Sequence, residues 1–321
     1  MYFRLILPAL VACLLVLMMG PYIIPLLRRW KFGQAIREDG PQWHAAKSGT
    51  PTMGGLMILT AIVLALVICR RHWTPDLWVG VGTVLGFGLI GFLDDGIKIV
   101  KKRNLGLNAV PKFLLQMLVA CAVSLYVVRH QGSVIRFPFT AFTVDLGWWY
   151  FPILVFVFLA TVNSYNLTDG LDGLSSSVGI VYFAAMALIF AGVEAIADPD
   201  MAALATACAG ALVGFLRFNT RPARIMMGDV GSLALGGAVA YLAVSGGLVL
   251  WLPIMAGTIA IASVSDILQL WSLRFRRRRM FKMAPLHHHL ELIGMDETRI
   301  VSMYTIVTVI LCMIGLMAVG W

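Results

Sequence analysis

The segment LWVGVGTVLGFGLIGFLDDGIK, residues 77–98, joins a long apolar run to two adjacent acids at its end. About twenty apolar residues in an α-helix cross a hydrocarbon core of roughly 30 Å. Similar runs recur along all 321 residues, and the chain is 60% hydrophobic and 13% charged. A soluble domain would carry about 25% charged residues. The sequence therefore predicts a polytopic membrane protein.

The apolar runs also select the type of membrane fold. In lipid, only helices and closed barrels satisfy their own backbone hydrogen bonds. These runs are continuous rather than alternating, which excludes a barrel. We predict an all-α bundle of about ten transmembrane helices that forms one integral membrane domain over residues 1–321. The predicted spans are 5–27, 52–69, 77–93, 113–128, 149–166, 174–193, 201–216, 231–247, 250–272 and 302–320.

The net charge of +9 follows the predicted topology and does not indicate nucleic-acid binding. Of the 25 Lys and Arg residues, 20 fall in the odd-numbered connections between spans. Positive residues accumulate on the cytoplasmic side of membrane proteins. We therefore predict that the odd connections are cytoplasmic and that both termini are external. The five cysteines lie within apolar runs without paired spacing, so we expect neither disulfides nor a zinc site.

Polar residues concentrate in four clusters, each at the end of an apolar run. Ionisable groups near a bilayer are costly, so their presence there indicates function. All four clusters fall on the predicted cytoplasmic face, which suggests one shared site. The clusters are Asp94–Asp95, Asn166–Gly173, Asp229 and His287–His289.

The two acids at 94 and 95 cannot have the same orientation, because neighbours on a helix point about 100° apart. We expect one carboxylate near a reacting phosphate and the other oriented by a lysine or a metal. Lys98 lies four residues after Asp94, on the same helical face. An ordinary ion pair at a solvated helix end explains Asp94 and Asp95 equally well.

The second cluster repeats every three residues at Asn163, Asn166, Asp169 and Asp172. On a helix or in a tight turn, this spacing produces one polar stripe. Its oxygen atoms are of the kind that Mg²⁺ prefers. The alternative interpretation is an interhelical loop that is rich in turn-forming residues.

The remaining clusters favour phosphate chemistry. Asp229 lies between glycines at a predicted helix start, which suits a metal-bound carboxylate beside an anion-binding helix end. Taken alone, it is more simply an N-cap. Three consecutive histidines on a helix cannot all bind one ion, so phosphate binding or proton transfer suits them better than zinc. We interpret Arg276–Arg279 as a stop-transfer run that also attracts anionic lipid headgroups.

Taken together, these segments resemble the bacterial phospho-N-acetylmuramoyl-pentapeptide transferases, in the polyprenyl-phosphate hexosamine-1-phosphate transferase superfamily. The resemblance covers nearly the whole chain. Its last segment is similar to the muramoyl-pentapeptide branch rather than the GlcNAc-phosphate branch. In chain order, the matching segments are KSGTPTMGG (47–55), DDGIK (94–98), NSYNLTDGLDGL (163–174), FN (218–219), MGDVGS (227–232) and MAPLHHH (283–289).

The resemblance implies a reaction at the cytoplasmic face of a bacterial inner membrane. Undecaprenyl phosphate attacks the β-phosphate of UDP-MurNAc-pentapeptide, UMP leaves, and the lipid-linked pyrophosphoryl sugar of peptidoglycan synthesis remains. It also implies a Mg²⁺ cofactor and a homodimer. The segment at 47–55 lacks the P-loop pattern, so ATP hydrolysis is not supported.

The resemblance also implies a role for individual residues. Asp229 holds Mg²⁺, and Asp94 deprotonates or positions the lipid phosphate. A general base and a covalent nucleophile are not separated by the sequence; we favour direct attack, which needs only positioning and charge neutralisation. The implied catalytic residues are Asp94, Asp95, Asp229 and His287. The implied substrate-binding residues are Lys47, Thr52, Lys98, Lys112, Asn166, Asp169, Asp172, Asn219, Met226, Gln269 and His288.

Two positions depart from the family pattern. Met226 stands where the family commonly has an aromatic residue that stacks on uracil. Ala262 stands where a glutamate is usual, and an acid, Asp266, follows one helical turn later. We predict that Asp266 faces the bundle or a groove rather than lipid.

Other activities fit the sequence less well. The same chemistry with UDP-GlcNAc is the nearest alternative, and the segment at 283–289 argues against it. A secondary transporter would place its charges near the bilayer midplane, whereas these acids lie at one surface. A structural scaffold would not need the acids.

Overall fold

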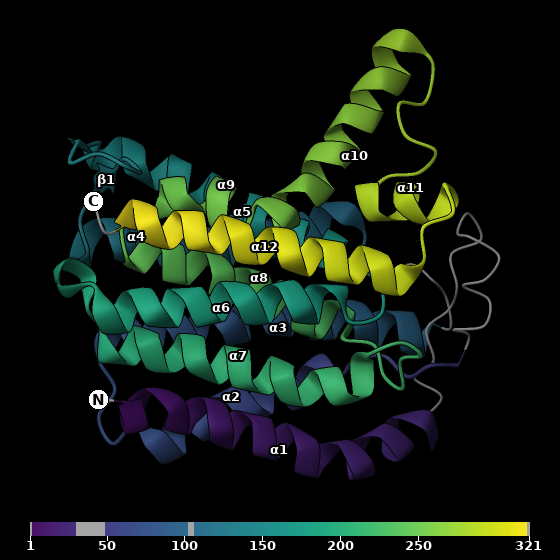
Figure 1. The fold of residues 1–321 in the computed structure, drawn as a ribbon, viewed down its shortest axis with the longest axis horizontal. Helices are drawn as coiled ribbons and strands as arrows, with labels where there is room; N and C mark the ends of the chain where they lie inside the picture. The colour runs from purple at the N-terminus through teal and green to yellow at the C-terminus, as the bar shows by residue number, and fades with distance from the viewer. Residues whose placement is uncertain (1, 30–48, 102–105, 320–321) are drawn as a thin grey trace.

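The computed structural model describes residues 2–29, 49–101 and 106–319, and these form a bundle of roughly parallel helices (Figure 1). The long helices are α1 (Tyr2–Arg29), α2 (Gly55–Cys69), α3 (Pro75–Val100), α4 (Ala109–His130), α5 (Tyr150–Thr168), α6 (Leu174–Gly192), α7 (Pro199–Asn219), α8 (Gly228–Ser245), α10 (Gly257–Arg276) and α12 (Glu297–Val319). The shorter elements are β1 (Val134–Arg136), β2 (Thr143–Asp145), η2 (Gly147–Trp149), η3 (Glu194–Ile196), η4 (Val249–Trp251), α9 (Leu252–Met255) and α11 (Leu286–Leu292).

The helical membrane fold predicted from the apolar runs is confirmed. Within the described ranges, eight helices are long and apolar enough to cross a membrane, and a bent pair would make a ninth. The remaining predicted span, 52–69, corresponds to the shorter helix α2. The chain is therefore a multi-pass membrane protein. The start of α1 and the end of α12 lie at the same end of the bundle (Figure 1).

The ninth predicted span is not one continuous helix, which corrects the expectation for residues 250–272. The segment Val249–Met255 and helix α10 are bent by 84° relative to one another. The break lies at Ala256, whose φ of −100° and ψ of 23° leave the α-helical region. Gly257 follows, and glycine is a weak helix former. Hydropathy alone cannot detect this bend, because both parts are apolar.

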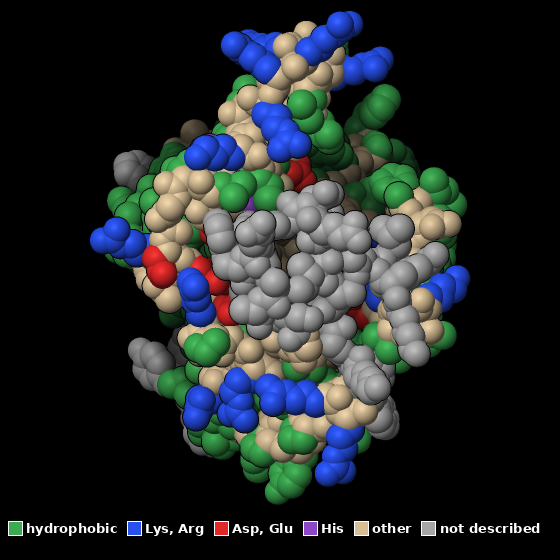
Figure 2. All heavy atoms as spheres, turned by 90° about the vertical axis from the view of Figure 1, so that its right-hand side faces the viewer, with side chains coloured by type: hydrophobic (Ala, Val, Ile, Leu, Met, Phe, Trp, Pro, Cys, Tyr) green, Lys and Arg blue, Asp and Glu red, His purple; other side chains and the backbone are tan. Residues whose placement is uncertain are grey.

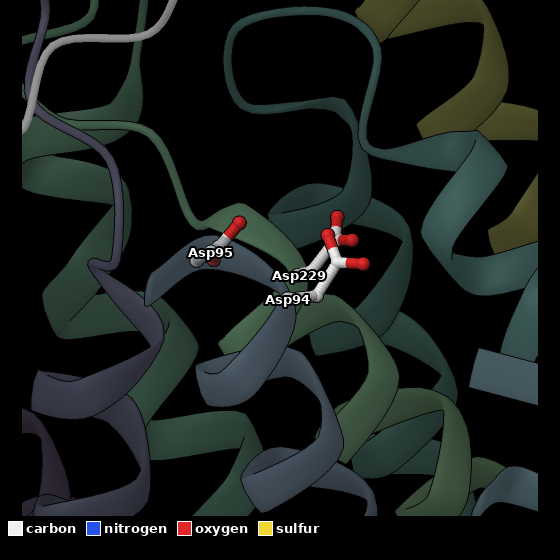
Figure 3. Close-up of side chains that lie close together, drawn as sticks. All are labelled: Asp94, Asp95 and Asp229. Carbon is white, nitrogen blue, oxygen red and sulfur yellow. The ribbon is translucent and has the colours of Figure 1, made fainter. Parts of the chain in front are cut away.

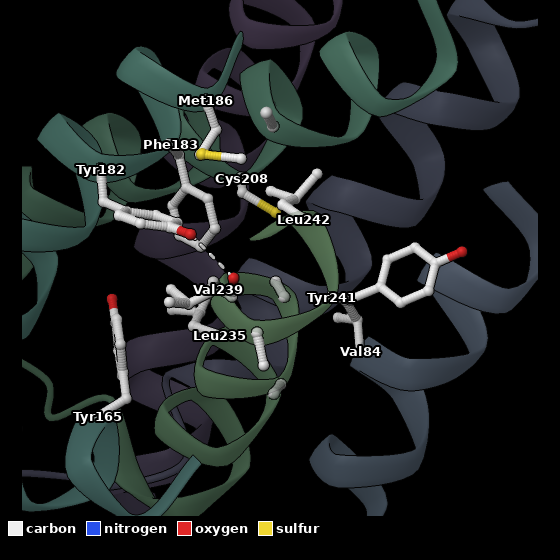
Figure 4. Packing of buried hydrophobic residues seen from close by; sticks show 14 of the residues in the cluster. Val84, Tyr165, Tyr182, Phe183, Met186, Cys208, Leu235, Val239, Tyr241 and Leu242 are labelled. Atoms are coloured by element: carbon white, nitrogen blue, oxygen red, sulfur yellow. Dashed lines mark hydrogen bonds between the residues drawn. The ribbon is translucent and has the colours of Figure 1, made fainter. Parts of the chain in front are cut away.

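The interior of the bundle is built around α7 and α8, which are the most enclosed of the spans. Buried tyrosine hydroxyls usually find a hydrogen-bond partner, and two in this core do. Tyr182 donates to the carbonyl of Val239 at 3.0 Å (Figure 4), and Tyr165 donates to Ser175 at 2.9 Å. These bonds join α6 to α8 and α5 to the start of α6.

Glycines allow α3 and α8 to come very close together. A Cβ atom placed on Gly91 would lie 2.1 Å from the backbone oxygen of Asp229. Any side chain at this position would therefore push the two helices apart. This contact lies one turn before Asp94, so the absence of a side chain at Gly91 is what brings Asp94 beside Asp229.

A small hairpin closes the end of the bundle where the termini lie. Strands β1 and β2 pair antiparallel, with Ile135 opposite Val144. The sequence predicts only a connection there, because three-residue strands are too short to give a clear alternating pattern.

Candidate active site

Three carboxylates from two helices meet at the end of the bundle opposite the termini. Asp94 and Asp95 end the buried part of α3, and Asp229 lies in the first turn of α8. One carboxylate oxygen from each lies within 4.8 Å of the others. Figure 3 shows Asp94 and Asp229 projecting together, whereas Asp95 points to another side of α3. The different orientations agree with the expectation from helical geometry.

Two lysines hold this acidic cluster together. The ammonium of Lys98 lies 2.6 Å from Asp94, 3.2 Å from Asp95 and 3.1 Å from Asp229. Lys112, near the start of α4, lies 2.6 Å from Asp229 and 3.5 Å from Asp94. Three carboxylates therefore share two cations. If all five groups are ionised, the cluster keeps one net negative charge.

Neutral groups fix the orientation of each acid. Asn166 donates to Asp229 Oδ1 at 2.9 Å and to Ser232 at 2.7 Å. The backbone N–H of Leu107 donates to Asp94 at 3.0 Å, and that of Val230 donates to Asp95 at 3.2 Å. These bonds give the cluster a defined shape before any ligand binds.

Thr52 is buried beside the cluster. Gly228 has a φ of +73°, and a Cβ atom there would lie 2.6 Å from Asp95 Oδ2 and 2.7 Å from Thr52 Oγ1. Only glycine fits this conformation and this space. The N–H groups of Gly54 and Gly55 donate to the carbonyls of residues 226 and 227, which ties the segment before α2 to the start of α8.

The polar stripe of residues 163–172 divides its contacts between several partners. Asp169 accepts a hydrogen bond from Ser175 at 2.6 Å, and burial raises the pKa of its carboxyl group to about 7. Asp172 accepts from the N–H of Ala223 at 3.0 Å. Asn163 donates to Gln116 at 2.8 Å. Of the four, Asn166 binds an acid of the cluster directly.

The histidines lie against the loop that follows α5. A Cβ atom on Gly170 would lie 2.4 Å from His287 Nε2 and 2.9 Å from His288 Nε2. His288 Nδ1 lies 2.8 Å from the carboxylate of Glu291, which is buried. If Glu291 is ionised, it can only accept a hydrogen bond, and His288 then donates from Nδ1 and presents Nε2 toward Gly170.

Two residues predicted to bind substrate use their polar groups elsewhere, and a third is buried. The amide of Asn219 accepts from Ser176 at 3.0 Å and donates to Ile225 at 3.1 Å. Gln269 accepts from Met280 and Phe281 and donates back to Phe281. The side chain of Met226 is buried. Each amide still has one N–H that none of these bonds uses. Lys47 lies outside the described residues.

Two acids with clear contacts were absent from the residues predicted from sequence. Glu291 pairs with His288, and its position three residues later in a short helix was a usable signal. Glu297 accepts from the N–H of Asp172 at 2.7 Å. That contact joins residues 125 positions apart in the chain, so no local pattern reveals it. Asp266 is half-buried, and its facing the bundle or a groove stays a prediction.

The acidic cluster suits a hard cation. All its ligand atoms are carboxylate oxygens, and the net negative charge of the fully ionised cluster favours a divalent ion. Oxygens on opposite sides of a Mg²⁺ are about 4.2 Å apart. One oxygen from each of the three acids lies within 4.8 Å of the others, which is close to that separation. The three acids can therefore bind a metal with small adjustments.

An apolar groove begins beside the cluster. A cavity of about 540 Å³ is lined by six residues of α4 and one of α5, namely Ala109, Val110, Lys112, Phe113, Leu114, Gln116 and Asn163. Val110, Phe113 and Leu114 make it apolar, and Lys112 lies in its wall while contacting Asp229. The face of the bundle that contains the cluster shows Lys and Arg side chains around its rim and acids nearer its centre (Figure 2).

Comparisons with known proteins agree with this description. Residues 77–247 match the model of glycosyl transferase family 4. The helical bundle, the membrane spans and this match define a membrane-embedded glycosyl transferase of that family. Residues 47–59 match signature 1 of the phospho-N-acetylmuramoyl-pentapeptide-transferases.

Full-length relatives narrow the class. A phospho-N-acetylmuramoyl-pentapeptide-transferase of Clostridioides difficile is 46% identical over 97% of this chain and 96% of its own length. Proteins of the same name from Thermoanaerobacter sp. and Bacillus pumilus are 46% and 42% identical, each over 96% of this chain and at least 95% of their own length. The chain belongs to the phospho-N-acetylmuramoyl-pentapeptide-transferase family.

Proposed function

We propose that this enzyme transfers phospho-MurNAc-pentapeptide from UDP-MurNAc-pentapeptide to undecaprenyl phosphate. A lipid phosphate oxygen attacks the β-phosphorus, the bond to UMP breaks, and the lipid-linked product of peptidoglycan synthesis forms. One phosphoanhydride replaces another, so the step is close to balanced in energy. The observation that carries this proposal is the meeting of Asp94, Asp95 and Asp229 with Lys98 and Lys112 beside an apolar groove.

The groove supports a lipid acceptor. Its apolar wall suits the polyprenyl chain, and Lys112 stands where the chain's phosphate would arrive. The ammonium group of Lys112 can move from Asp229 to a phosphate, because the phosphate also carries negative charge and compensates the lysine. Lys112 would therefore bring the acceptor phosphate next to the cluster.

The cluster supplies positioning and charge neutralisation, which account for most of phosphoryl-transfer catalysis. Asp94 would orient the acceptor phosphate or accept its proton. Lys98 would stabilise charge on the transferred phosphate. His287 and His288, with Gly170 and Asp169 of the adjacent loop, would contact the donor. Direct attack fits these roles without a covalent intermediate.

We propose Mg²⁺ as the cofactor, held by Asp229 with Asp94 and Asp95 beside it. The ion would neutralise the donor pyrophosphate when bound. We also propose that the site faces the cytoplasm from the bacterial inner membrane and that the enzyme is a homodimer. The excess of Lys and Arg in the connections at this end supports that orientation.

The direct test uses the purified protein with labelled UDP-MurNAc-pentapeptide and undecaprenyl phosphate. We expect UMP release and a labelled lipid product with Mg²⁺, no turnover with EDTA, and recovery when Mg²⁺ is restored. UDP-GlcNAc is run in parallel. Faster turnover of UDP-GlcNAc would show that UDP-GlcNAc, and not UDP-MurNAc-pentapeptide, is the donor. Absence of UMP release from both donors would reject the proposal.

A further inference from the structure

Helix α10 stands away from the bundle. It bends by 84° from the segment before it and projects beyond the other helices (Figure 1). The chain then returns along α10 through residues 277–285 to reach α11. Helix and return segment together form a hairpin, which we call the α10 hairpin (residues 257–286).

The α10 hairpin has its polar side chains inside. Ser265, Gln269 and Ser272 share one face of the helix and are all buried. Gln269 accepts from the N–H groups of Met280 and Phe281 at 3.1 and 2.9 Å. On the same face, Ser272 Oγ donates to the Arg278 carbonyl at 2.8 Å, and the Leu286 N–H donates to Ser265 Oγ at 3.0 Å.

The outer surface of the hairpin is apolar. Ile267, Leu270 and Phe275 are 64%, 66% and 71% exposed, and they point in different directions around the helix. A helix in water would bury these side chains and expose the serines and glutamine. In this inverted arrangement, Ser265, Gln269 and Ser272 bond backbone groups of residues 278–286. Lipid requires irregular backbone to be satisfied in this way. The α10 hairpin is therefore built to lie in hydrocarbon.

The tip of the hairpin carries five arginines within six residues, Arg274 and Arg276–Arg279, and all five are exposed. Over the described part of the chain, none of them forms an ion pair with an acid. Arg276 lies over the ring of Trp271, 4.9 Å from its centroid. Figure 2 shows basic side chains gathered on the projecting tip. In this hairpin, guanidinium groups lie at the end of an apolar stem. In a lipid leaflet, phosphates lie at the ends of the acyl chains, so the two arrangements are complementary.

We propose that the tip of the α10 hairpin is a binding surface for the headgroups of anionic phospholipids. The apolar stem fixes the depth of the hairpin, and the arginines then lie at the height of the lipid phosphates. Basic residues near such a surface attract anionic lipid, and the attraction falls off within a Debye length. This surface is separate from the acidic cluster and does not depend on the donor or acceptor of the reaction.

The test follows the local lipid around Trp271, which is half-exposed on the stem. The full-length protein is placed in phosphatidylcholine vesicles with the same small fraction of brominated phosphatidylglycerol or brominated phosphatidylcholine. Quenching that belongs to Trp271 is obtained by subtracting the signal of Trp271→Phe. We expect at least about twofold stronger quenching by the anionic lipid, and a smaller difference at high salt.

The test variant is R274Q/R277Q/R278Q/R279Q, which keeps Arg276 on Trp271. The matched control, R28Q/R29Q/R217Q/R224Q, removes four charges from α1, α7 and the loop after it at the same end of the bundle. The preference for phosphatidylglycerol should vanish in the tip variant and survive in the control. Equal quenching by both lipids in the wild type, or a preference that survives in the tip variant, would overturn the proposal. If the tip variant does not fold, the salt dependence of the wild type decides.

Discussion

The two ends of the bundle both contain buried ionic groups, but they combine them differently. At the end near the termini, Asp200 pairs with Arg70 and also accepts the N–H of Thr74 at 3.1 Å. One acid and one base satisfy each other there. At the opposite end, three carboxylates share two lysines.

This difference separates a structural ion pair from a reactive one. A matched buried pair has no spare charge, and removing one partner leaves the other uncompensated. A cluster with an excess of one sign has charge left for a ligand, and such clusters favour functional sites. The groove beside Lys112 gives a ligand access to that excess.

The largest expected effect comes from neutralising one acid of the cluster. Asp229→Asn and, separately, Asp94→Asn keep the shape of the side chain but remove a charge that phosphoryl transfer needs. We expect UMP release to fall by about 10²–10⁴-fold while the protein stays folded. Steady-state UMP release and thermal unfolding in detergent measure the two quantities.

Asp76→Asn is the matched control, because Asp76 lies on the same helix α3 at its other end. It accepts from Tyr126 at 2.7 Å and from Gln131 at 2.9 Å, and asparagine can still accept both bonds. Its turnover should equal that of the wild type. Near-normal turnover of both Asp229→Asn and Asp94→Asn would remove the distinction between the two ends.

The next effect is on stability at the other end. Arg70→Leu leaves the buried carboxylate of Asp200 without its cation. We expect the free energy of unfolding to fall on the order of 3 kcal/mol, which a lower melting temperature would show. Turnover per folded molecule should not change, because this ion pair lies at the end of the bundle opposite the acidic cluster. A lower turnover without a lower melting temperature would show that this ion pair also serves the reaction.

A smaller effect tests a matched pair that lies near the site. Glu291→Leu removes the acceptor that orients His288. At metal-bound histidines, loss of such a partner lowers metal affinity or activity by about 10–100-fold. We expect about a tenfold fall in kcat with little change in KM. Glu291→Gln, which can still accept from Nδ1, should recover most of it. In a His288→Ala background, Glu291→Leu should have no further effect; an equal loss in both backgrounds would assign Glu291 a purely structural role.

Sequence was sufficient for the helical fold, because apolar runs of span length need no partner to be recognised. It also placed Asp94, Asp95 and Asp229 at one end, since alternating topology fixes which connections share a side. It could not show the bend at Ala256 or the inner face of α10, where Gln269 is bonded to residues 280 and 281. Both features depend on which backbone groups still need hydrogen-bond partners in the folded protein. Composition does not reveal this.

The three-residue repeat from Asn163 to Asp172 shows the same limit in one loop. The spacing correctly indicated a polar segment at the end of α5. It could not indicate that Asn166 would bind Asp229 while Asp169 binds Ser175, because the chain leaves the helix after Thr168. Asp169 is thus an acid near the cluster with a neutral hydroxyl donor as its hydrogen-bond partner.

The smallest effect concerns this acid and its pH dependence. Burial raises the pKa of Asp169 from 3.8 to about 7 in the folded protein, so folding favours its protonated form. The stability that comes from protonated Asp169 is fully present below pH 3.8 and is lost as the pH rises through about 7. Asp169→Asn cannot ionise, so its melting temperature should rise relative to the wild type between about pH 5 and 8, measured in EDTA. A constant difference across this range would mean that Asp169 titrates at its ordinary pKa and that its surroundings are more hydrated than its contacts indicate.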